Sequence, residues 1–216
     1  MIVRAFRRLA WMLAFVAVAP AFAQDGKVLA VLGLGKNYRE IAQQPVANAS
    51  KIEVIDFFFY ACPYCNELRP TLERWRASLP ADVEFRRMPV IRHDSWEPLA
   101  RTYFTLEALG AVERLHDAVY VGYHDEELHM SKPDVMADWA QRHGLNRDEW
   151  LKTYSSDAVT RKVEIARKAT KDYDIRGTPS LVVAGRYLTS SGLTDDVKLV
   201  TPVADLLIEL ARSRRK

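Results

Sequence analysis

Segments with the hydrophobic pattern of β-strands alternate along the chain with segments that have the pattern of α-helices, and their order predicts an α/β fold. The segment 51–60, Lys-Ile-Glu-Val-Ile-Asp-Phe-Phe-Phe-Tyr, is rich in β-branched and aromatic residues and too apolar for a half-exposed strand, which predicts a strand in the middle of a sheet. Residues 63–78 have apolar positions at helical spacing, and Pro63 suits the first turn, where a missing amide donor costs nothing. Apolar runs at 83–91 and 28–34 predict a further strand and a short edge strand.

From residue 95 to about residue 174 the pattern becomes wholly helical. Ser131 and Asn146 are expected to cap two of these helices, since each precedes an apolar periodic run with acids in its first turn. The expected helices cover residues 95–109, 111–122, 132–143, 147–154 and 157–173.

The last forty residues return to strand patterns and then to a helix. Residues 180–184 and 186–189 flank Gly185 and predict a hairpin, and a final helix is expected from about Asp195 to Arg212. The order is thus βαβ, a helical block, and ββα. Splitting the two units in this way predicts one sheet, formed by residues 24–94 and 175–216, with a helical subdomain inserted at 95–174.

The first 23 residues have the pattern of a cleaved export signal. Three arginines without an acid come first, then the apolar run 11–19, and then the small-x-small site Ala21-Phe22-Ala23. The apolar run is too short to cross about 30 Å of hydrocarbon as a helix, although an uncleaved amphipathic anchor is the alternative. We therefore expect export to a compartment in which disulfides persist.

Composition and charge narrow the function further. The chain has 216 residues, 49% hydrophobic and 27% charged, which excludes a low-complexity or wholly disordered protein. Without residues 1–23 it carries 28 basic and 28 acidic residues, so a nucleic-acid-binding surface is not supported. Two cysteines exclude both a disulfide-rich scaffold and a four-thiolate zinc site.

Both cysteines lie in Cys62-Pro63-Tyr64-Cys65, where the predicted central strand meets a helix. The positive end of the helix stabilises a thiolate at Cys62, lowers its pKa and makes it the attacking or leaving sulfur. A disulfide across so small a loop removes little chain entropy, so a purely structural bridge is a weaker alternative. A metal site would need two more ligands, and the five histidines show no spacing that supplies them.

Two further residues fit redox chemistry. Asp56 lies in the predicted central strand, six residues before Cys62, where an acid is costly unless it is used or paired. It is a candidate proton acceptor or donor for Cys65, or it turns to the open end of the strand and meets water or a lysine. Pro179 follows Gly177 and Thr178 and opens the first strand of the hairpin, a position suited to a cis peptide bond.

A hydrophobic strand that ends in Cys-Pro-x-Cys, with a distant Gly-Thr-Pro before a hairpin, resembles the thioredoxin superfamily. The export signal, the helical insert and the segment Phe57-Phe58-Phe59-Tyr60-Ala61-Cys62 narrow the resemblance to the DsbA family of periplasmic thiol:disulfide oxidoreductases. The motifs are specific together, because Cys-x-x-Cys alone occurs in many proteins. The resemblance covers the whole chain after residue 23.

The resemblance implies a role for each site residue. Cys62 would be the exposed nucleophile and Cys65 its buried partner, while Pro179 would be a cis-proline that faces the disulfide. The backbone of Thr178 would pair with an extended substrate segment, which Pro63 and Tyr64 would also contact. Asp56 matches the buried acid of the superfamily, where DsbA proteins usually have glutamate.

Tyr64 departs from the family pattern. DsbA proteins usually have histidine between the proline and the second cysteine, whereas Pro-Tyr is typical of glutaredoxins. Without that imidazole the thiolate should be less stabilised, so we expect a milder oxidant. Its potential should lie between about −120 mV, as in DsbA, and about −270 mV, as in thioredoxin.

The predicted function is donation of the Cys62–Cys65 disulfide to reduced exported proteins, without a separate cofactor. The resemblance implies reoxidation by a quinone-linked inner-membrane partner of the DsbB type, and we expect a monomer. An isomerase or reductase of the same superfamily is a competing interpretation, although no added dimerisation domain is visible in residues 24–50. The residues also leave open a binding or chaperone module with a structural disulfide, and a glutathione-linked enzyme.

Overall fold

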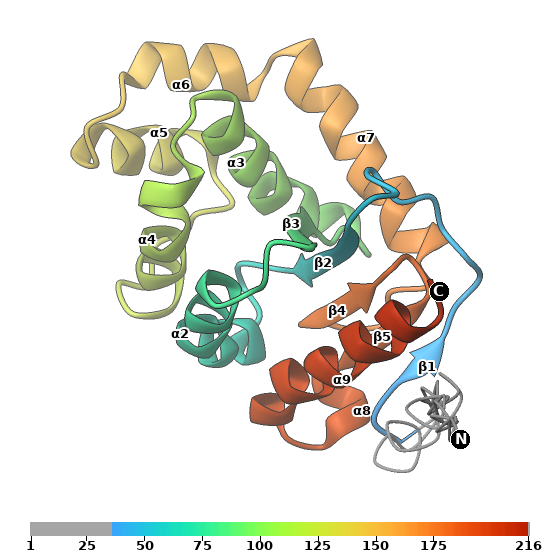
Figure 1. The fold of residues 1–216 in the computed structure, drawn as a ribbon. Helices are drawn as coiled ribbons and strands as arrows, with labels where there is room; N and C mark the ends of the chain where they lie inside the picture. The colour runs from blue at the N-terminus through green and yellow to red at the C-terminus, as the bar shows by residue number, and fades with distance from the viewer. Residues whose placement is uncertain (1–35, 216) are drawn as a thin grey trace, which may run out of the picture.

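The computed structural model describes residues 36–215, so the expected signal segment 1–23 and edge strand 28–34 lie outside the described residues. The remaining elements follow the expected order of βαβ, helices and ββα (Figure 1). Strands β2 (Ile52–Phe58) and β3 (Val83–Pro89) flank helix α2 (Pro63–Ala77), and the hairpin strands are β4 (Ser180–Val183) and β5 (Tyr187–Ser190).

The sheet has five strands in the order β1-β5-β4-β2-β3, in which β1 is a two-residue edge strand, Arg39–Glu40, that the hydrophobic pattern does not predict. Every residue of β2 is buried, the acids Glu53 and Asp56 included, as expected for a central strand. It pairs in parallel with β3 and antiparallel with β4. Ser180 of β4 therefore lies opposite Phe57, so the start of the hairpin meets the end of the central strand.

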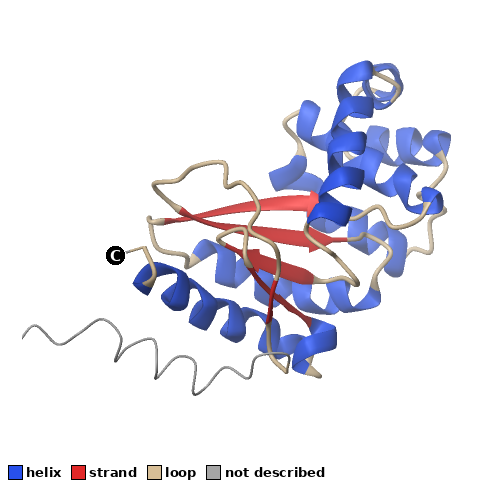
Figure 2. Ribbon diagram, turned by 90° about the vertical axis from the view of Figure 1, so that its right-hand side faces the viewer, coloured by secondary structure: helices blue, strands red, loops and turns tan. Residues whose placement is uncertain are grey.

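Helices α2 and α9 (Val200–Ser213) cover one face of the sheet (Figure 2). Leu68 and Leu72 of α2 meet Leu181 of β4 and Ala204 of α9 in one apolar cluster. The other face packs against the helical block, where the Phe57 ring lies 5.0 Å from the Tyr173 ring. The sheet thus has an apolar core on each face.

Helices α3 to α7 lie between β3 and β4 in the chain and form the block in the upper part of Figure 1. Asn146 caps α6 as expected, because its side chain accepts a hydrogen bond from the Glu149 amide. The expected cap at Ser131 is wrong: Lys132 occupies the N-cap of α5, without a side-chain cap bond. After the 3₁₀ turn η1 (Asp94–Trp96), the helices are α3 (Glu97–Ala108), α4 (Val112–His124), α5 (Pro133–Arg142), α6 (Arg147–Tyr154) and α7 (Asp157–Asp172).

The final helix begins later than Asp195. A short helix, α8 (Ser191–Thr194), ends at Asp195, whose φ of 57° is left-handed and cannot continue a helix. A 3₁₀ turn, η2 (Val197–Leu199), then leads into α9 at Val200. The difference matters for the site, because the α8 turn borders the groove described below.

Candidate redox site

Cys62 stands at the N-terminus of α2, directly after the central strand. It is the N-cap residue, and its carbonyl accepts the first helical hydrogen bond from the Asn66 amide at 3.1 Å. Its own amide donates to the Phe59 carbonyl at 3.0 Å, which turns the chain out of β2. Pro63 occupies the first helical position, and no acid lies in the first turn, so the positive end of the helix is uncompensated at Cys62.

The two thiols have opposite electrostatic environments. Cys62 is half-buried, whereas Cys65 is buried. A hydrogen bond from Cys65, with further ones from the Thr178 side chain and from the amides of Cys65 and Tyr64, lowers the pKa of Cys62 to about 6, although burial opposes the shift. Burial raises the pKa of Cys65 well above its ordinary value, and its bond to Cys62 adds to the effect. At pH 7, therefore, Cys62 is mainly a thiolate and Cys65 a thiol.

Thr178 and Pro179 face Cys62 from the start of the hairpin. The Thr178–Pro179 peptide bond is cis, and Cys62 Sγ lies 3.1 Å from the Thr178 carbonyl oxygen. Ser180 Oγ donates to the Gly177 carbonyl at 2.8 Å and holds the loop before β4. The antiparallel pairing of β2 and β4 thus brings the predicted residues Cys62, Thr178 and Pro179 together.

Asp56 lies beneath the cysteines, on the face of β2 that α2 covers. It is 2% exposed, and it shares the lining of a small cavity with Cys65 and Pro179. Burial raises its pKa to about 7; the charge of Arg87 acts against this shift and that of Glu73 adds to it. Asp56 therefore does not turn to water or to a lysine, and an arginine is its charged neighbour.

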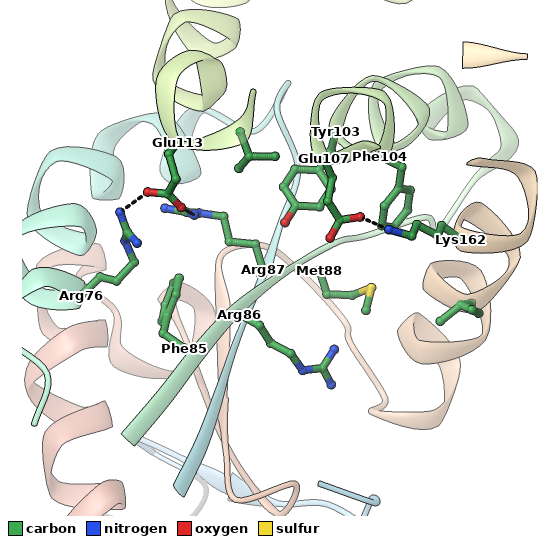
Figure 3. A pocket seen from close by; sticks show the side chains of 12 residues that line it. Arg76, Phe85, Arg86, Arg87, Met88, Tyr103, Phe104, Glu107, Glu113 and Lys162 are labelled. Atoms are coloured by element: carbon green, nitrogen blue, oxygen red, sulfur yellow. Dashed lines mark hydrogen bonds and ion pairs between the residues drawn. The ribbon is translucent and has the colours of Figure 1, made fainter. Parts of the chain in front are cut away.

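Sequence reasoning missed Arg87, which the parallel register of β2 and β3 places opposite Asp56. Its side chain is only 6% exposed and forms ion pairs with Glu73 and, at 3.7 Å, with Glu113. Arg76 joins the same carboxylates at 3.0 and 2.8 Å. Figure 3 shows Arg87 beside Glu113 along a cavity of about 460 Å³. This cavity lies on the outer side of β3, and neither cysteine lines it.

His116 of α4 was also missed, because its isolated position gives no sequence signal. It is buried and lines the small cavity with Asp56 and Cys65. Its Nδ1 atom lies 2.9 Å from the Tyr60 hydroxyl. Burial lowers the pKa of His116 well below its ordinary value, so the imidazole is neutral at pH 7.

Tyr64 opens onto a third cavity, which is also lined by Thr178, the residue whose carbonyl oxygen contacts Cys62 Sγ. The side chain of Tyr64 is 58% exposed, and the cavity, about 360 Å³, is further lined by Leu188 and the two arginines Arg39 and Arg176. We call it the arginine groove. It runs from the cis-proline loop across β5 to the α8 turn. Thr178 connects it to the reactive sulfur, because the Thr178 carbonyl oxygen lies 3.1 Å from Cys62 Sγ.

Metal-binding and membrane-spanning features are absent from the part of the chain that the structure describes. Residues 36–215 contain no cluster of three or more histidine, cysteine or acidic side chains placed to hold a metal ion. Over the same range, none of the helices combines the length and apolarity that a bilayer crossing requires.

The sheet, the Cys-x-x-Cys helix and the cis-proline loop define a thioredoxin-fold thiol:disulfide oxidoreductase with a helical insertion. Residues 82–200 match the family described as DSBA-like thioredoxin domain. The thiol:disulfide interchange protein DsbA of Azotobacter vinelandii is 36% identical over 181 residues, covering 83% of this chain and 85% of that protein. The chain therefore belongs to the DsbA family.

Solved structures agree with this assignment. The crystal structure of Pseudomonas aeruginosa DsbA matches with a TM-score of 0.82 at 34% identity, covering 86% of this chain and 97% of that one. The oxidoreductase DsbA from Xylella fastidiosa matches with a TM-score of 0.78 at 29% identity, covering 86% and 99%.

Proposed function

We propose that this protein donates its Cys62–Cys65 disulfide to reduced proteins that have been exported to the periplasm. The observation that carries this proposal is the opposite shift in the pKa values of the two thiols. Cys62, with a pKa of about 6, is a good leaving group at neutral pH, whereas buried Cys65 is held as a thiol. Such a pair favours the reduced enzyme and hence an oxidised client.

The reaction proceeds by two exchanges. A client thiolate attacks Cys62 Sγ, the Cys62–Cys65 bond breaks, and Cys65 leaves with the electron pair and takes up a proton. The client's second thiolate then attacks the client sulfur of the mixed disulfide, and Cys62 leaves as a thiolate. The client loses two electrons, and both enzyme cysteines end reduced.

Asp56 is suited to move the proton at Cys65. Its pKa of about 7 allows it to hold or release a proton near neutral pH. The small cavity shared with Cys65 has about 10 Å³, close to the space that one water needs. In this proposal the carboxyl gives a proton to Cys65 as that sulfur leaves, and Arg87 limits how far burial raises the carboxyl pKa.

Client binding follows from the exposed loop around the nucleophile. Thr178 offers its backbone to an extended segment beside Cys62, with Pro179 below the disulfide. Pro63 and Tyr64 form the other side of the approach, since Tyr64 is largely exposed. The helical insert at 95–174 is proposed as a subdomain between the two parts of the thioredoxin fold, 24–94 and 175–216.

The location, oligomeric state and reoxidation partner that we propose follow the family resemblance. We propose a cleaved export signal at residues 1–23, a monomer in the periplasm, and reoxidation by a quinone-linked membrane protein of the DsbB type. That partner would accept two electrons and two protons from the reduced pair. The proposal needs no cofactor bound to this chain, because both electrons are carried by sulfur.

Redox equilibrium with glutathione tests the direction of transfer. We expect a potential between about −120 and −270 mV, together with rapid oxidation of a reduced two-cysteine peptide. Cys62→Ser should abolish peptide oxidation and insulin reduction. A potential at or below that of thioredoxin would instead favour a reductase, and turnover that persists in Cys62→Ser would exclude the proposed chemistry.

A further inference from the structure

The arginine groove carries more positive charge than the disulfide chemistry needs. Arg39 of β1 and Arg176 of the cis-proline loop line it from two segments far apart in the sequence. Both pair with one carboxylate: Arg39 Nη1 lies 2.9 Å from Asp174, and Arg176 Nη2 lies 2.8 Å from it. Two guanidiniums therefore share a single acid, and the hydrogen bond from Arg176 helps to hold the pKa of Asp174 below its usual value.

Further charged residues lie on the segments around the groove. A third guanidinium, that of Arg92, donates to the backbone carbonyl of Arg176. Of the acids on neighbouring segments, Glu40 pairs with Arg186 at 2.7 Å and Asp94 pairs with Arg167 at 2.9 Å, while Asp195 and Asp196 follow the lining residue Leu193. Among the residues that line the groove itself, the charged side chains are Arg39 and Arg176, so the lining presents positive charge in a chain that is close to neutral without residues 1–23.

The charge lies close to the reacting sulfur. Arg176 precedes Thr178 by two residues, at most about 7 Å along the backbone, and the Thr178 carbonyl touches Cys62 Sγ. The Arg176 side chain is 75% exposed, so its guanidinium can take a second carboxylate without unfolding the loop. A client side chain two or three residues from the bound cysteine reaches the same distance.

We propose that the arginine groove selects client segments with an aspartate or glutamate within about three residues of the cysteine that attacks Cys62. The inference rests on the proposed function and adds a class of preferred substrate. Arg176 and Arg39 act as specificity-determining residues: they attract and position the acidic side chain, while the exchange of sulfur bonds is unchanged. An electrostatic preference of this kind is stronger at low ionic strength.

Matched peptides test the preference. Two-cysteine peptides that differ only in glutamate, glutamine or lysine, placed two residues before or after the first cysteine, are oxidised by the full-length oxidised protein. The rate is followed by acid quenching and mass spectrometry. We expect glutamate to exceed lysine about three- to tenfold at low salt in at least one position, and the ratio to fall below about twofold at about 0.5 M salt.

A glutamate near the cysteine also changes the reactivity of the peptide thiol itself. Variants of the protein separate that effect from the effect of the groove. Arg176→Gln should lower the glutamate-to-lysine ratio, because only Arg39 then remains in the groove, and Arg176→Glu should reverse the preference in favour of lysine. Arg161→Glu makes the same charge change at an exposed position of α7 and should leave the ratio intact. Circular dichroism melting checks that each variant is folded.

The outcomes distinguish the two proposals. Equal ratios in wild type and Arg176→Glu, with normal oxidation of uncharged dithiothreitol, would overturn the acidic preference alone. An equal loss in Arg161→Glu would also overturn it, since net charge would then be the cause. Failure to oxidise both the peptides and dithiothreitol would overturn the proposed function itself.

Discussion

Cys62 Sγ lies 3.1 Å from the carbonyl oxygen of Thr178, although 116 residues separate the two positions in the chain. The contact exists because β4 pairs antiparallel with β2, which aligns the start of one strand with the end of the other. The entire helical block is accommodated between these two strands without disturbing their register. The reactive end of the molecule is therefore built by sheet pairing, and its electrostatics can be tested one residue at a time.

The Cys62 thiol should titrate with a midpoint near pH 6. The cause is the set of hydrogen bonds from Cys65, Thr178 and the first amides of α2. Ultraviolet absorbance of the thiolate in the reduced protein measures this value, with Cys62→Ser as the blank. Cys65→Ala removes the first of those bonds and should raise the midpoint. A wild-type midpoint near that of a free cysteine, about 8.5, would contradict the proposed leaving-group role.

Replacing Tyr64 with histidine should make the protein a stronger oxidant. An imidazolium at this exposed position adds positive charge close to Cys62, which favours the thiolate and so the reduced form. Each tenfold gain in thiolate stabilisation raises the potential by about 30 mV. Equilibration with glutathione measures the change, and Tyr64→Phe is the matched control, expected to stay at the wild-type potential. An unchanged potential in Tyr64→His would show that the residue between Pro63 and Cys65 does not set the oxidising strength.

The contribution of Asp56 to the free energy of unfolding should fall as pH rises from about 4 to about 7. Its folded pKa of about 7 exceeds the unfolded value of 3.8, so the folded state binds more protons in this range. The slope is about 1 kcal/mol per pH unit and levels off above about pH 7. Urea unfolding at several pH values measures it. Asp56→Asn should remove this part of the slope and increase stability at about pH 8; an identical slope in that variant would show that Asp56 is ionised throughout.

Gly185→Ala should destabilise the hairpin that carries Pro179 into place. Gly185 has a φ of 66°, and an added Cβ would lie 2.5 Å from the Gln44 carbonyl oxygen, a backbone atom that cannot move aside cheaply. We expect a loss of about 1–3 kcal/mol in unfolding free energy. Gly177→Ala is the control, because its added Cβ meets nothing within 4 Å. Equal losses in the two variants would remove the steric explanation.

The sequence predicted the elements whose signals are local. The β-branched and aromatic residues of β2, the helical spacing after Pro63 and the glycine at 185 between two strand patterns each correspond to an observed element. The start of the last helix was wrong because the backbone at Asp195 turns left-handed, which an acid at a helix start does not reveal. The two-residue strand β1 escaped because its pairing with β5 depends on tertiary contacts alone.

The charged partners of the site were harder to predict. Arg87 lies in a strand that was predicted from its apolar residues alone. Its position opposite Asp56 follows from the parallel register of β2 and β3, which the sequence does not reveal. Glu53, a second buried acid in β2, is held by Arg86 at 2.8 Å through the same pairing. Two adjacent arginines in a strand beside an acid-bearing strand were the available signal. Which arginine meets which acid depends on a one-residue choice of register.

The pairing of β2 with β4 also means that the site is completed only by the last part of the chain. A chain that crosses a membrane amino end first exposes both cysteines when more than half of its length has yet to emerge. The loop at Thr178 and Pro179 arrives only with the last forty residues. Until that segment pairs with β2, Thr178 and the cis-proline do not stand beside Cys62.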